Sequence, residues 1–107
     1  MGATISGMGY FLVTTVHGPR WDESRGVREQ DGWDAHAAFM DRLVEDGFVI
    51  LGGPIGDRAV LVIEAHGEDE IEQRMESDPW KPMGILRVGA IEPWTIWLDG
   101  RTTPARR

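Results

Sequence analysis

The residues of this sequence best suited to chemistry are its three histidines, His17, His36 and His66. No two of them have the spacing of a metal site, and the sequence has no H-E-x-x-H or H-x-H motif. Cysteine is absent, which excludes a thiolate nucleophile, a disulfide scaffold and a Cys-ligated metal site. We therefore expect no metal, and the histidines are candidates for acid–base chemistry.

His36 is the strongest of these candidates because it falls on the apolar side of a predicted helix. Apolar spacing predicts a helix over residues 33–46, ended by Gly47. One face of that helix would point inward: Trp33, His36, Ala37, Met40, Leu43 and Val44. A buried imidazole without a hydrogen-bonding partner costs about 1–3 kcal/mol. His36 is therefore either an acid–base residue or a core histidine bonded to a backbone carbonyl.

Asp78 is the natural partner for His36. It lies three residues after Met75, on the apolar side of a second predicted helix over 68–77 if that helix continues, and Pro79 ends it. A carboxylate at a helix C-terminus is unfavourable with the helix dipole, and misfits of this kind occur at functional sites. The simpler alternative is an Asx turn, in which Asp78 bonds its own backbone.

Aromatic and basic residues surround these candidates in the sequence. Trp21 and Trp33 border a long charged loop over residues 18–30 and could stack on a flat ligand. The remaining tryptophans would fill the core or a dimer interface: Trp80, Trp94 and Trp97. Three loop arginines could bind a carboxylate or phenolate, or could balance nearby acids on a wet surface: Arg20, Arg25 and Arg28.

The elements that would position these residues alternate in a simple order. The predicted strands cover 9–17, 48–53, 59–65 and 85–98, and the predicted helices cover 33–46 and 68–77. The order β-α-β-β-α-β predicts an α+β, ferredoxin-like fold: one antiparallel sheet with two helices on one face. Pro93 restricts the last strand to an edge or a bulge. We expect residues 1–98 to form this single domain and residues 99–107 to be a flexible C-terminal tail.

Two of the predicted strands are apolar on both faces, over Phe48–Leu51 and Val60–Ile63. Two helices can cover only one face of the sheet, and a large bare apolar face is rare on a monomer. The economical solution is a second copy stacked sheet to sheet about a two-fold axis, which can close a barrel. The sequence therefore predicts a homodimer.

Charge and composition narrow the possible partners. Eighteen acidic and eleven basic residues give a net charge of −7, the wrong sign for binding nucleic acid. No apolar run approaches the roughly 20 residues that span a bilayer, and Met1 to Tyr10 lacks the basic start of a signal peptide. The first six residues fit a loose myristoylation pattern, but no basic patch follows. We expect a cytoplasmic protein with no membrane partner and, lacking any phosphate-binding loop, no cofactor.

Six short pieces in a fixed order resemble the YCII-related (YciI-like) family over nearly the whole of residues 9–98. The pieces are RGVREQ at 25–30, HAAFM at 36–40, GFVILGGP at 47–54, DPW at 78–80, GIL at 84–86 and EPW at 92–94. The resemblance implies a homodimeric ferredoxin-like α/β barrel with a catalytic His–Asp pair, which falls on His36 and Asp78. The longer spacing between Arg28 and His36 is a departure from the family's pattern.

The leading hypothesis is a cofactor-free lyase or isomerase that moves a proton on a small polar metabolite, possibly aromatic. One family member resembles a dehydrochlorinase of chlorinated hydroxyquinols, and muconolactone isomerases use similar scaffolds. His36 would be the general acid–base, since an unperturbed imidazole titrates near ~6.5, and Asp78 would hold its tautomer. Four further residues would contact the ligand: Trp21, Arg28, Trp33 and Trp80. The alternatives are a non-catalytic small-molecule-binding module and a cofactor-free monooxygenase.

Overall fold

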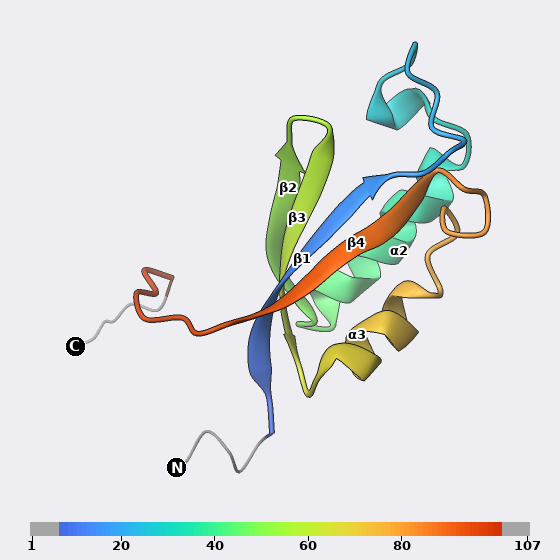
Figure 1. The fold of residues 1–107 in the computed structure, drawn as a ribbon. Coiled ribbons are helices and arrows are strands. Elements are labelled where there is room, and N and C mark those ends of the chain that lie inside the picture. Colours follow the sequence, from blue (N-terminus) through green and yellow to red (C-terminus); the bar gives the residue numbers. More distant parts are fainter. Residues whose placement is uncertain (1–6, 102–107) are drawn as a thin grey trace.

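The structure is a computed structural model, and it describes residues 7–101. The described chain forms seven elements (Figure 1): β1 Gly9–His17, the 3-10 helix η1 Val27–Glu29, α2 Trp33–Glu45, β2 Val49–Ile55, β3 Arg58–Ala65, α3 Glu68–Met75 and β4 Leu86–Trp94. The start of the chain, with its possible myristoylation pattern, and residues 102–107 of the predicted tail lie outside the described residues. No helix between residues 7 and 101 is long and apolar enough to cross a bilayer.

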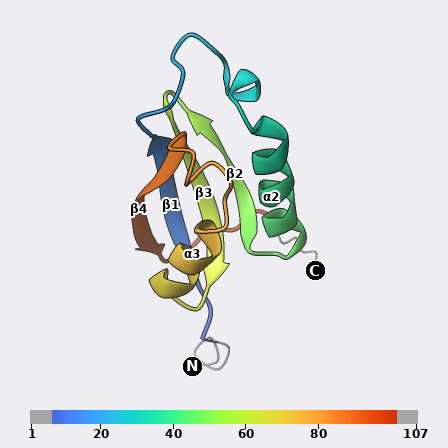
Figure 2. The same ribbon diagram turned by 90° about the vertical axis from the view of Figure 1, so that its right-hand side faces the viewer.

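The four strands form one antiparallel sheet in the order β2-β3-β1-β4. Both α-helices lie against the same face of this sheet, and the other face carries no helix (Figure 2). The predicted α+β architecture is therefore confirmed, with an element order and sheet compatible with the ferredoxin-like fold. β4 is an edge strand, as Pro93 requires.

The core lies between the sheet and the two helices. Alternate residues of β1, namely Phe11, Val13 and Thr15, are buried on the helix side. The helices cover them with Leu43 from α2 and with Ile71 and Met75 from α3. Because side chains alternate along a strand, the intervening residues of β1 face the opposite, uncovered side.

The structure corrects two details of the sequence prediction. Val44 is 53% exposed, and Phe39 packs against the core in its place. The last strand ends at Trp94 and not at Leu98. Trp94 pairs with Tyr10, and β1, the strand that pairs with β4, begins only one residue before Tyr10. Beyond that point the chain has no strand to pair with.

The start of α3 is fixed by a side chain that reaches back along the chain. The Glu70 carboxylate accepts a hydrogen bond of 2.7 Å from the His66 backbone N–H, so a donor in the turn before the helix is satisfied. The same hydrogen bond holds the pKa of Glu70 below its usual value. A carboxylate whose pKa falls on folding contributes stability above its unfolded pKa and loses it as the pH drops through its folded pKa.

We expect Glu70→Ala to lower the free energy of unfolding by about 1 kcal/mol at pH 7, the usual cost of losing such a bond. At pH 3 the difference from the unmodified protein should shrink, since the carboxyl is then partly protonated. Urea denaturation at both pH values measures this. Glu72→Ala, an exposed change on the same helix, is the control. An equal loss in both variants at pH 7 would contradict the assignment.

Candidate active site

His36 and Asp78 are in direct contact although 42 positions separate them in the chain. The Nδ1 atom of His36 lies 2.9 Å from Oδ1 and 3.1 Å from Oδ2 of Asp78. Both side chains are almost entirely buried, with 12% of His36 and 8% of Asp78 exposed. His36 stands in the first turn of α2, and Asp78 lies in the turn that follows α3. The predicted contact is therefore present in the fold.

The Asp78 carboxylate also accepts a hydrogen bond from within its own turn. α3 ends at Met75, and Oδ1 of Asp78 accepts a 2.9 Å hydrogen bond from the Trp80 backbone N–H. This is the Asx turn that the sequence offered as the simpler alternative, and it occurs together with the contact to His36. The turn fixes the carboxylate in place, and its position outside the helix removes the conflict with the helix dipole.

The His36 ring lies flat on the indole of Trp80. The ring centroids are 3.9 Å apart and the planes differ by 9°. Trp80 is fully buried, and its Nε1–H donates a 2.6 Å hydrogen bond to the backbone carbonyl of Asp31. The ligand contact expected of Trp80 is thus not available on the surface of a single chain. Its indole instead fixes the plane of the imidazole.

Two further tryptophans, both half-buried, gather around this stack. The Trp33 ring lies 5.9 Å from the rings of both His36 and Trp80. Trp21 meets Trp80 edge-on at 6.2 Å and stacks on His17 at 3.7 Å. His17 is therefore part of this aromatic cluster. Trp33 lies near enough to His36 to line a ligand site beside it, whereas Trp21 contacts His17 and Trp80.

The long loop before α2 is organised by Gln30, a residue that no sequence pattern singles out. Gln30 is 4% exposed, and its side-chain amide donates to the carbonyls of Asp22 at 2.8 Å and Arg25 at 3.2 Å. Its Oε1 accepts the Asp22 N–H at 3.0 Å. A buried amide that satisfies backbone groups eight residues away closes the loop into a compact unit. A lone glutamine in a charged segment carries no pattern from which this could be inferred.

The loop arginines are not brought to the His36–Asp78 pair. Arg25 forms ion pairs of 3.2 Å with Asp22 and Asp31. Arg28 stands exposed on η1. In the part of the chain that the structure describes, neither makes a hydrogen bond or ion pair with His36 or Asp78. Arg25 therefore balances nearby acidic groups on the exposed surface, which is the simpler of the two alternatives predicted for it.

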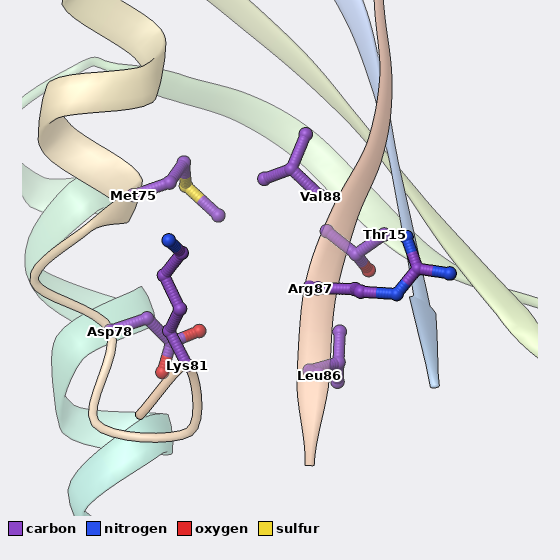
Figure 3. Close-up of a pocket in the computed structure, with 7 residues that line it drawn as sticks. All are labelled: Thr15, Met75, Asp78, Lys81, Leu86, Arg87 and Val88. Carbon is purple, nitrogen blue, oxygen red and sulfur yellow. The ribbon is translucent and has the colours of Figure 1, made fainter. Parts of the chain in front are cut away.

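A small cavity borders the carboxylate (Figure 3). It has a volume of about 20 Å³, enough for one water molecule, and its walls come from α3, the turn after it, β1 and β4. The lining residues are Thr15, Met75, Asp78, Lys81, Leu86, Arg87 and Val88. A metabolite does not fit inside this cavity.

Between residues 7 and 101, no three His, Asp or Glu side chains gather closely enough to hold a metal ion. Comparison of the sequence with protein-family models, with curated proteins and with solved structures finds no match. Any functional assignment therefore depends on the geometry of the pair and its surroundings.

Truncation of Trp80 should remove the support of the imidazole and leave a cavity. We expect Trp80→Ala to lower the free energy of unfolding by about 3–5 kcal/mol. Trp80→Phe keeps a ring under His36 but leaves the Asp31 carbonyl without its donor, so a smaller loss of about 1–3 kcal/mol should follow. Denaturant titration measures both. Equal stability of Trp80→Phe and the unmodified protein would show that the indole N–H bond contributes nothing.

Proposed function

We propose that this protein is a cofactor-free lyase or isomerase in which His36 transfers a proton on a small polar metabolite. The observation that carries the proposal is the buried hydrogen bond between His36 Nδ1 and Asp78. A carboxylate can only accept a hydrogen bond, so Nδ1 carries the proton and the Nε2 lone pair is left as the base. When Nε2 takes a proton, the adjacent carboxylate stabilises the imidazolium that forms.

The proposed reaction needs a carbon acid as its substrate. Nε2 of His36 would remove a proton from a carbon attached to a carbonyl, directly or through a conjugated double bond, and the electron pair would move onto the carbonyl oxygen as an enolate. In an isomerase the imidazolium returns that proton to another carbon, and in a lyase the electron pair expels a leaving group. Trp33 would hold a flat substrate beside the imidazole. The same pair of residues is what the resemblance to the YCII-related family implies.

A homodimer is part of the same proposal. The sheet face opposite the helices exposes Leu51 by 54%, Ile55 by 50% and Trp94 by 45%. Stacking that face on a second copy would remove these apolar side chains from water. The His36–Asp78 pair lies on the other side of the sheet, so each chain would keep its own site.

The second candidate function is a small-molecule-binding module without turnover. In that case His36 would recognise an acidic or hydroxyl group of the ligand, and activity would be absent at every pH.

Proton transfer separates the two candidates and can be measured without knowing the natural substrate. The probes are muconolactone-type lactones and chlorinated hydroxyquinols in D₂O, with exchange or chloride release followed by NMR. We expect His36→Gln to lower the rate by about 10²–10⁴-fold, the usual contribution of general acid–base catalysis. Asp78→Asn should lower it by a similar order, because an amide can hold the wrong tautomer.

The control is His66→Gln, which changes an exposed histidine on the far side of α3 and should leave the rate unchanged. Full turnover in His36→Gln with any active probe would remove His36 from the mechanism. Binding of a probe without exchange, in a protein whose His36→Gln variant no longer binds, would favour the second candidate.

A further inference from the structure

The chain after β4 forms a short apolar arm, Thr95–Leu98, that extends away from the sheet and helices (Figure 1). Trp97 is 87% exposed and Leu98 is 93% exposed. An indole in this state leaves on the order of 200 Å² of apolar surface in water. Two adjacent large apolar side chains in such a position are unfavourable unless another surface covers them.

The arm is held at both ends and so is not a loose tail. At its start Trp94 pairs with Tyr10 of β1. At its end the Arg101 guanidinium lies 5.9 Å above the Tyr10 ring, and Arg101 Nε donates a 2.8 Å hydrogen bond to Asp99. Hydrogen bonds from Arg101 lower the pKa of Asp99 to about 2, so this clamp stays ionised at neutral pH. Contacts with Tyr10 therefore lie on both sides of the arm.

The described chain is too extended for a closed domain of its size. Its radius of gyration is 15.2 Å, with extents of 48 × 28 × 22 Å. A compact domain of about this length has a radius near 13 Å. The projecting arm accounts for part of the difference, since the sheet and the two helices pack as one unit.

The open face of the sheet and the arm both expose apolar side chains, but within one chain the arm does not pack on that face. The open face of the sheet consists of the residues that point away from the helices, among them Leu12, Val16, Leu51, Ile55, Val60, Val62 and Trp94. Trp94 belongs to this face and leads directly into the arm. The arm itself turns away from the face (Figure 1).

We propose that the arm of each chain packs on the open face of a second copy, so that Trp97 and Leu98 of one chain contact Leu51 and Ile55 of the other. This inference rests on the homodimer proposed above and specifies which residues hold it together. A stable interface needs roughly 800 Å² from each partner, and the arm and the sheet face together would contribute to that area. The arm carries no charge, which suits a contact between two chains of net charge −7 each.

The first test measures the oligomeric state of Trp97→Ala/Leu98→Ala by sedimentation over a dilution series. Both side chains are exposed on the single chain, so the variant should fold, and its circular dichroism should match the unmodified protein. We expect the dimer to dissociate at least about 30-fold more readily, as is usual for loss of an apolar hot spot. Thr102→Ala/Thr103→Ala, just beyond the arm, is the control.

The second test locates the contact and uses the absence of cysteine from the chain. Trp97→Cys in one tagged copy and Leu51→Cys in another are mixed and oxidised. We expect a disulfide-linked species of twice 12.0 kDa that contains both tags. Gln73→Cys, on the exposed side of α3, replaces Leu51→Cys in the control and should not cross-link above the level of random collision.

Each outcome decides the proposal. A dimeric double variant with unchanged affinity would overturn the role of the arm and leave the stacked-sheet dimer in place. Cross-linking to position 73 as efficient as to position 51 would overturn the contact. A monomeric unmodified protein would overturn both the proposed contact of the arm and the homodimer. Proton transfer by His36 is measured separately, so this result would not decide it.

Discussion

The hydrogen bond between the His36 imidazole and the Asp78 carboxylate is the interaction on which the proposed function of this protein depends. Each group would be costly to bury alone, and each is acceptable because the other satisfies it. The bond joins the first turn of α2 to the turn after α3, so it also ties the two helices together across the face of the sheet. Trp80 stabilises both groups: its indole stacks on the imidazole, and its backbone N–H donates a hydrogen bond to the carboxylate.

The sequence was sufficient for the parts of the fold that follow from periodicity. Alternation and continuous apolar runs located all four strands, and the misplaced histidine on the apolar side of α2 pointed to His36. A carboxylate among apolar positions likewise points to Asp78 as its partner. The contact and the Asx turn were posed as alternatives, since a sequence does not show that one carboxylate has enough oxygen lone pairs for both.

Other features depend on tertiary contacts that leave no local pattern. Gln30 closes its loop through backbone groups, and any of several polar residues in that segment could have been chosen on composition. The sequence alone does not distinguish Trp80 from a ligand-binding tryptophan, because the burial of Trp80 against His36 depends on how α2 packs against the turn after α3. The end of β4 at Trp94 is set by the start of its neighbour β1. No local pattern shows this limit, so the sequence predicts a strand that continues through the exposed arm.

The most direct measurement of the central claim is the tautomer of His36, observed by ¹⁵N NMR of the imidazole nitrogens at a pH where the ring is neutral. The account predicts a protonated Nδ1 and an unprotonated Nε2, the reverse of the tautomer that free histidine prefers. In Asp78→Asn this preference should weaken or disappear. A neutral His36 with its proton on Nε2 in the unmodified protein would contradict the account, because Asp78 would then accept nothing from the ring and the proposed base would be occupied.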